Sequence, residues 1–168
     1  YPSIFLSEEA ARIKIEVGLR ETPLTPPVHL KARTLLMSPF TRKSLVPNIE
    51  VVTLSMQEAI AEKLRAALTR LEPAIRDFFD IDYLASRNKI DLDDRHLFQL
   101  LAEKLKVPGN PPIDLSLARK VKLKTQINTE LKPVLRPVDF ERFDLDHVFN
   151  ITMDVVQMLP IWKEKIPS

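Results

Sequence analysis

The chain has 168 residues, enough for one domain, or one domain and part of another, with a substantial core. It contains no cysteine and only two glycines, which excludes disulfides, cysteine nucleophiles, zinc–thiolate sites and glycine-rich phosphate loops. A net charge of +2 is too small to indicate nucleic-acid binding by itself.

The N-terminal part of the sequence predicts strands and a long loop. Arg12–Arg20 alternates apolar and polar residues with a period of two, which is typical of a half-buried strand, and Glu16 lies on its polar face. Five prolines then interrupt Glu21–Pro47, where Val28–Met37 can form a strand within an otherwise irregular region. Ile49–Leu54 predicts a further strand that leads directly into a helix.

The first central helix begins at a capping box. Ser55 and Glu58 have the required S-x-x-E spacing, so the helix is predicted to start at Met56. Its apolar stripe is Met56, Ile60, Leu64, Ala67, Leu68 and Leu71. Lys63 lies on the edge of this stripe among alanines, and Arg70 follows it one heptad later. These two cations either face phosphates in a crevice or extend past a close helix contact into solvent.

The second central helix, Pro73–Ala85, is apolar around most of its circumference, which predicts burial. Arg76, Asp77 and Asp80 share one sector of it and can meet at helical spacings of three and four residues. Buried charges must be paired or used, so the sector is either catalytic or a structural arginine–aspartate pair. Asp82 points the other way and is expected to be solvated or to cap a helix.

Three short motifs occur in order: I-K-I-E in the predicted strand, E-K-L-R-A in the first central helix and R-D-F-F-D-I in the second. Together they resemble the AbiEii/AbiGii toxin family, whose members are nucleotidyltransferase-like toxins of bacterial toxin–antitoxin and phage-defence pairs. The resemblance extends over roughly residues 12–101 of the chain. It implies metal-dependent transfer of a nucleotide from a nucleoside triphosphate to an acceptor, which is expected to be RNA, such as tRNA ends.

The resemblance also implies roles for particular residues. Glu16 becomes a candidate ligand for Mg²⁺ or Mn²⁺, although a strand residue paired with a neighbouring cation explains it equally well. Lys63 would contact the triphosphate, with Arg70 and Arg76 as further phosphate ligands. Asp77 or Asp80 would orient or activate a reacting group. A cognate antitoxin protein is the implied partner.

The chain departs from the family pattern in one respect. No G-S…D-x-D motif occurs in it, and the chain begins at Tyr1 rather than Met, close to a predicted strand. We therefore expect an N-terminally truncated protein, inactive by itself unless the missing portion stays bound.

The rest of the chain predicts helices. Asp91 or Asp93 is expected to cap a helix that runs to Leu105, and Asp144 or Asp146 to cap the last one. His147 is expected to have no special role. Between Lys104 and Arg136 there are eight basic and two acidic residues, densest at Arg119–Lys124. They form either an RNA-backbone contact or a solvated face.

These patterns together predict an α+β protein with a partial nucleotidyltransferase-like sheet and a mainly helical C-terminal region. The expected division is residues 1–54, the β region with its proline-rich loop, and residues 55–168, the helical region. A helical protein-interaction or RNA-binding module without catalysis is the alternative. No run of about 18 apolar residues occurs, so no membrane span is expected, and we expect a cytoplasmic protein.

Overall fold

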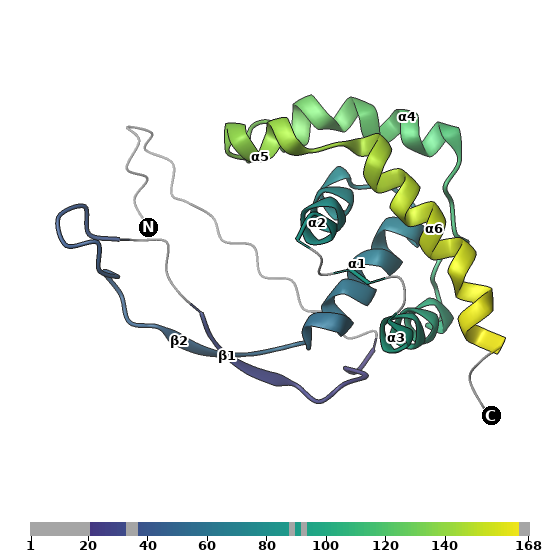
Figure 1. Ribbon diagram of the computed structural model, residues 1–168, viewed down its shortest axis with the longest axis horizontal. Helices are drawn as coiled ribbons and strands as arrows, with labels where there is room; N and C mark the ends of the chain where they lie inside the picture. The colour runs from purple at the N-terminus through teal and green to yellow at the C-terminus, as the bar shows by residue number, and fades with distance from the viewer. Residues whose placement is uncertain (1–20, 33–36, 88–89, 92–93, 165–168) are drawn as a thin grey trace.

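The computed structural model of the chain describes residues 21–32, 37–87, 90–91 and 94–164, with side chains as far as Leu159. This part is α+β, as predicted, and an antiparallel hairpin leads into a helical body (Figure 1). The strands are β1 (Val28–Ala32) and β2 (Ile49–Thr53). The helices are α1 (Met56–Thr69), α2 (Ile75–Ala85), α3 (Arg95–Lys106), α4 (Leu117–Gln126), the short π-helix η1 (Ile127–Leu131), α5 (Pro137–Arg142) and α6 (Leu145–Glu164).

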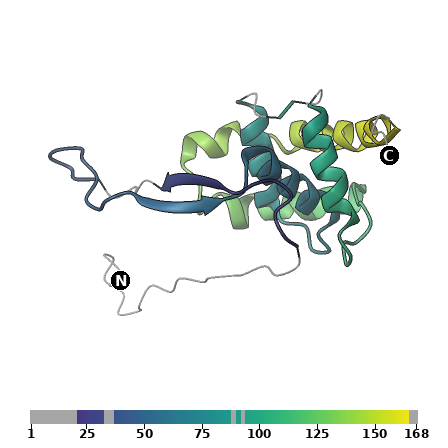
Figure 2. The ribbon, with the colours of Figure 1, turned by 90° about the horizontal axis from the view of Figure 1, so that it is seen from below.

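The hairpin confirms the two strands predicted within Val28–Met37 and at Ile49–Leu54. Its register pairs Val28 with Thr53 and Ala32 with Ile49. Figure 2 shows the hairpin extending away from the helices, and the side chains of Leu30, Ile49 and Val52 are more than half exposed. The described hairpin therefore contributes little to the core. The strand predicted at residues 12–20, with Glu16, lies outside the described residues.

The core lies among the helices, with α1 at its centre. Helices α2 and α3 pack against α1, and α6 crosses both α2 and α3 (Figure 1). The predicted apolar stripe of α1 is confirmed at its four inner positions, Ile60, Leu64, Ala67 and Leu68. It is wrong at Met56 and Leu71, which are 61% and 79% exposed because they lie in the first turn and beyond the last.

Glu58, in the first turn of α1, is buried and connects three parts of the chain. Ser55 caps the helix by accepting a hydrogen bond from the Glu58 N–H at 3.2 Å, as the capping box predicts. The Glu58 carboxylate instead accepts from the N–H groups of Leu24 and Thr25, at 2.9 and 2.8 Å, and from the Thr25 hydroxyl. It also lies 3.0 Å from the ammonium of Lys104, itself only 2% exposed.

The C-terminus of α1 is held by a second buried cation. Arg119 donates to the carbonyl oxygens of Ala67 and Arg70, at 2.8 and 2.9 Å, and these carbonyls would otherwise lack partners at the helix end. Our assignment of Lys104 and Arg119 to a basic surface cluster is therefore wrong. Each binds groups in or beside α1, more than 40 residues away in sequence.

The capping residue of α3 differs from the prediction by a few positions. Asp94 accepts from the N–H groups of His96 and Leu97, at 2.9 and 3.2 Å, and so begins the helix. The sequence indicated Asp91 or Asp93, and Asp93 lies outside the described residues. The acidic run offered several caps, and Asp94, immediately before the helix, is the described residue that caps it.

The start of α6 confirms one cap and corrects two other expectations. Asp144 accepts from the N–H groups of Asp146 and His147, as predicted. The His147 Nδ1 lies 2.9 Å from the carboxylate of Asp82, which is 8% exposed. Asp82 is therefore neither solvated nor a cap, and His147 has a role in joining α6 to α2. None of the described helices has both the length and the apolarity needed to cross a membrane.

The pKa of Glu58 generates a prediction about stability. Burial alone would raise this pKa, but the hydrogen bonds from Thr25, Leu24 and Lys104 outweigh it and lower the pKa from 4.5 to about 2. As the pH falls from about 4.5 towards 2, the unfolded chain binds a proton here while the folded chain does not. The free energy of unfolding should then fall by up to about 3 kcal/mol.

Urea unfolding at pH 6 and pH 3 tests this. The Glu58→Gln variant should be less stable than the wild type at pH 6 and should lose that part of the pH dependence. Glu103→Gln, at a mostly exposed position on α3, should keep it. If Glu58→Gln leaves the pH dependence of stability unchanged, the lowered pKa of Glu58 is not its source.

Candidate functional site

Five of the six predicted site residues line one pocket, which we call the charged pocket. It encloses about 460 Å³ between α1, α2 and the chain after η1. The five are Lys63, Arg70, Arg76, Asp77 and Asp80. Glu16, the sixth, lies outside the described residues. Phe79, Leu131, Val134 and Leu135 complete the wall.

The packing of α1 against α2 explains why these side chains meet. Lys63 and Arg70 are seven residues apart, which is two turns of α1, so both face the same side. Asp77 and Asp80 are one turn apart on α2 and face them. The chain reverses at Pro73, which is buried just before α2, so residues close in sequence face one another across the two helices.

The ion pairs across the pocket differ from those the sequence predicts. The Lys63 Nζ lies 2.7 Å from Asp80 Oδ2 and 3.6 Å from Asp77 Oδ1, and the Arg70 Nε lies 3.4 Å from Asp77 Oδ2. Arg76, expected to meet these aspartates, has no ion-pair partner among the described residues. The two aspartates therefore pair with Lys63 and Arg70 across the pocket, and not with Arg76 on their own helix.

Burial distinguishes the two carboxylates. The side chain of Asp80 is 41% exposed, whereas that of Asp77 is 6% exposed. Asp77 Oδ2 is buried and receives no hydrogen bond from any residue that the structure describes, although Arg70 is near it. An unsatisfied buried carboxylate oxygen is costly, so Asp77 retains an unused hydrogen-bond acceptor beside the pocket.

The carboxylates around Lys63 keep its ammonium group protonated. Its partial burial lowers the pKa, but the hydrogen bond and charge of Asp80, with a further contribution from Asp77, raise the pKa above its usual value. Lys63 is therefore a cation at neutral pH and not a base. With Arg70 and Arg76 it gives the pocket three cations against two carboxylates, an excess that suits an anionic ligand.

The same residues do not suit a divalent metal. Each of the two carboxylates already faces a cation, and the described part of the chain contains no group of three histidine, aspartate or glutamate side chains that could hold a metal ion. The Mg²⁺ or Mn²⁺ implied by the sequence resemblance stays a prediction that involves residues outside the described ones.

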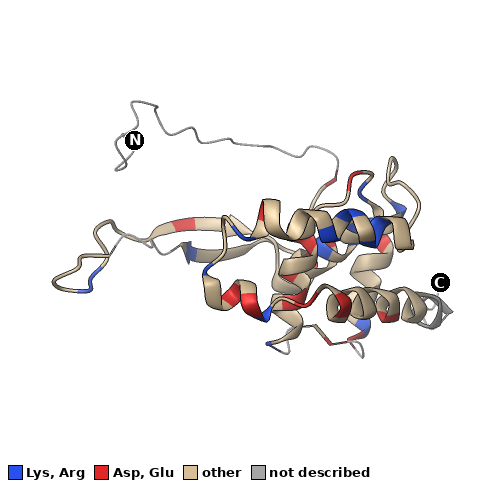
Figure 3. Ribbon diagram, turned by 90° about the horizontal axis from the view of Figure 1, so that it is seen from above, with Lys and Arg blue, Asp and Glu red and all other residues tan. Residues whose placement is uncertain are grey.

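The basic run on α4 has fewer available cations than its sequence suggests. Figure 3 shows the lysine and arginine band along this helix. Arg119 is buried, Lys120 lies 2.7 Å from Asp146, and Lys122 lies 3.8 Å from Glu72. The pairing of these side chains reduces the positive charge that a phosphate backbone would meet.

The fold and the charged pocket thus define an α+β protein with a cationic cleft between two helices. The sequence model of the AbiEii nucleotidyl transferase toxin, of type IV toxin–antitoxin systems, matches residues 1–154, so the chain belongs to the AbiEii family. Membership implies an antitoxin as partner and a nucleoside triphosphate as substrate. Comparison with curated proteins and with solved structures found no significant match.

The ion pair between Lys63 and Asp80 can be tested directly. Replacing Asp80 by Asn removes the hydrogen-bonding carboxylate while the burial of Lys63 remains, so the pKa of Lys63 should fall. Titration of the lysine Cε signals by NMR measures this shift. Asp154→Asn, on an exposed face of α6, should leave Lys63 unchanged. If Asp80→Asn also leaves it unchanged, the pair does not form in solution.

Proposed function

We propose that the charged pocket binds the phosphates of a nucleoside triphosphate, and that the protein transfers a nucleotide from this donor to an acceptor, which we expect to be RNA. The observation that carries the proposal is the convergence of Lys63, Arg70 and Arg76 on one pocket beside Asp77, whose buried Oδ2 receives no hydrogen bond from the described residues. Membership in the AbiEii family supports it independently.

The three cations suit different parts of a phosphate chain. Guanidinium groups bind phosphate oxygens with two parallel hydrogen bonds, and Arg76 is exposed at the pocket rim without an ion pair among the described residues. Lys63 acts as a compact charge on the α1 side of the pocket. A triphosphate entering here would share Lys63 with Asp80, because the ammonium has three donors.

The reaction requires few groups from the protein. An acceptor hydroxyl oxygen bonds to the α-phosphorus, the bond from that phosphorus to the pyrophosphate oxygen breaks, and the hydroxyl loses its proton. In our proposal Asp77 accepts the hydrogen bond and then the proton of the hydroxyl, and Asp80 positions Lys63. Lys63 and Arg70 stabilise the negative charge that develops on the departing pyrophosphate.

The alternative is a protein-interaction module in which the same charges only join α1 to α2. Arg70–Asp77 and Lys63–Asp80 would serve that purpose without any ligand. The excess cation, and the buried Asp77 oxygen that no described residue hydrogen-bonds, favour the nucleotide-binding role, because a contact that only joins two helices requires neither. Substitution of Lys63 distinguishes the two.

Titration calorimetry of the 168-residue chain with a nucleoside triphosphate, with and without Mg²⁺, tests the proposal. Lys63→Ala should weaken binding about ten- to 150-fold, because a hydrogen bond to a charged group contributes about 1.5–3 kcal/mol. Lys122→Ala, an exposed lysine of α4, should bind as the wild type does.

Two results would contradict the proposal. One is wild-type affinity in a folded Lys63→Ala variant, with circular dichroism as the check on folding. The other is a wild-type chain that binds no triphosphate while Lys63→Ala lowers only its stability or its affinity for an antitoxin. Either would make the interaction module the better account.

A further inference from the structure

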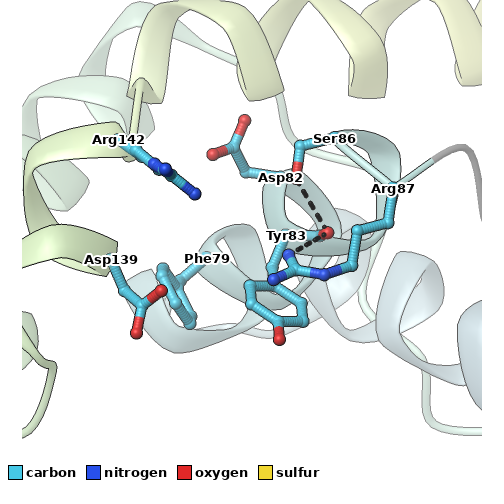
Figure 4. A pocket seen from close by; sticks show the side chains of 7 residues that line it. All are labelled: Phe79, Asp82, Tyr83, Ser86, Arg87, Asp139 and Arg142. Atoms are coloured by element: carbon cyan, nitrogen blue, oxygen red, sulfur yellow. Dashed lines mark hydrogen bonds between the residues drawn. The ribbon is translucent and has the colours of Figure 1, made fainter.

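A second pocket, which we call the tyrosine pocket, shares the ring of Phe79 with the charged pocket. It encloses about 320 Å³ between the second half of α2 and α5. Figure 4 shows its main lining side chains, which are Phe79, Asp82, Tyr83, Arg87, Asp139 and Arg142. None of them has a part in the proposed phosphate binding.

The two pockets are consecutive parts of one surface along α2. Arg76, Asp80 and Tyr83 follow at intervals of four and three residues, which puts them on one face of α2, and Arg87 lies just beyond the end of that helix. At a rise of about 1.5 Å per residue, Tyr83 lies about 10 Å along the helix from Arg76. A ligand held by its phosphates at Arg76 can therefore extend past Phe79 towards Tyr83.

The tyrosine pocket presents a stacking surface. The guanidinium carbon of Arg87 lies 3.4 Å from the centre of the Tyr83 ring, and Arg87 Nη1 donates to the Tyr83 carbonyl oxygen at 3.3 Å. The Tyr83 residue is 38% exposed, and its ring lies 6.0 Å from that of Phe79. Aromatic rings and guanidinium planes are the surfaces on which proteins stack nucleobases.

The polar groups around this surface offer both donors and acceptors. Arg142 has no ion-pair partner in the described part of the chain, and its guanidinium points into the pocket (Figure 4). Asp139 uses Oδ2 to bind Arg136 Nε at 2.6 Å, and this hydrogen bond lowers the pKa of Asp139, so its carboxylate remains an acceptor at neutral pH. The edge of a nucleobase requires both kinds of group.

We propose that the tyrosine pocket binds a nucleobase, stacked on the Arg87–Tyr83 pair with its polar edge towards Asp139 and Arg142. This rests on the proposed function for the triphosphate that the charged pocket would hold, since the nearest source of a base is that donor nucleotide. The same chemistry is present in a base near the acceptor end of an RNA, and the experiment separates the two sources.

The test compares the affinities of four ligands by titration calorimetry: ATP, CTP, inorganic tripolyphosphate and a short oligoribonucleotide. The variants are Tyr83→Ala, which removes the ring, and Arg87→Lys, which keeps the charge but removes the planar group. Phe40→Ala is the matched control, because Phe40 is 94% exposed on the hairpin loop. Tyr83 and Arg87 are also exposed, so both variants should fold.

Tyr83→Ala should weaken nucleotide binding about five- to 150-fold, the range that alanine substitution gives for base stacking, and leave tripolyphosphate binding unchanged. Arg87→Lys should act in the same direction. If only oligoribonucleotide binding weakens, the base belongs to the acceptor. Wild-type affinities for all ligands in both variants, or a chain that binds neither nucleotides nor the oligoribonucleotide, would overturn the proposal.

The two proposals can fail separately. If tripolyphosphate does not bind but the oligoribonucleotide binds in a Tyr83-dependent manner, only the phosphate role of the charged pocket is lost. If tripolyphosphate binding depends on Lys63 but nucleotides bind equally well without the Tyr83 ring, only the base site is lost.

Discussion

The burial of α1, with charged groups fixed at both of its ends, is the constraint on which the rest of the structure depends. At its start, Glu58 is fully buried and binds both the chain at Leu24–Thr25 and the ammonium of Lys104. At its end, Arg119 binds the last carbonyl groups. A buried ion pair of this kind does not always stabilise a protein more than apolar packing would. Removing one partner, however, leaves a buried charge without compensation and strongly destabilises the fold. The contacts of Glu58 and Arg119 hold α1 in place, and with it Lys63 and Arg70, which form one side of the charged pocket.

The charged pocket combines two features that a structural contact between helices does not require. One is its excess of cations over carboxylates, and the other is a carboxylate oxygen of Asp77 that is buried without a hydrogen-bond donor among the described residues. Both are costs to the isolated protein that a ligand with phosphates and a hydroxyl would relieve. The tyrosine pocket beyond Phe79 extends the same surface of α2, so the proposed phosphate site and the proposed stacking site lie within the reach of one nucleotide.

The sequence predicts the helices and the members of the charged pocket because both follow from local spacing. The capping serines and aspartates and the period of 3.6 residues locate α1, α2 and α6, and the i, i+3 and i, i+4 rules put Asp77 and Asp80 on one side of α2. The sequence does not reveal pairs formed by residues far apart along the chain. Glu58 with Lys104, and Asp82 with His147, depend on how helices cross. The sequence therefore indicated a capping role for Glu58, a basic surface for Lys104, solvation or a cap for Asp82 and no special role for His147. The expected Arg76 contacts failed for the same reason, since Lys63 and Arg70 approach from another helix.

The most direct test of a nucleotide site along α2 is an NMR titration of the isotopically labelled chain with ATP, followed through backbone amide and side-chain signals. If one nucleotide occupies both pockets, the signals of Lys63, Arg70, Arg76, Tyr83 and Arg87 should shift together with a single dissociation constant, while those of Lys122 and Phe40 should not. A single constant is expected because one ligand would occupy both pockets. Shifts confined to α4, or none along α2, would contradict the account.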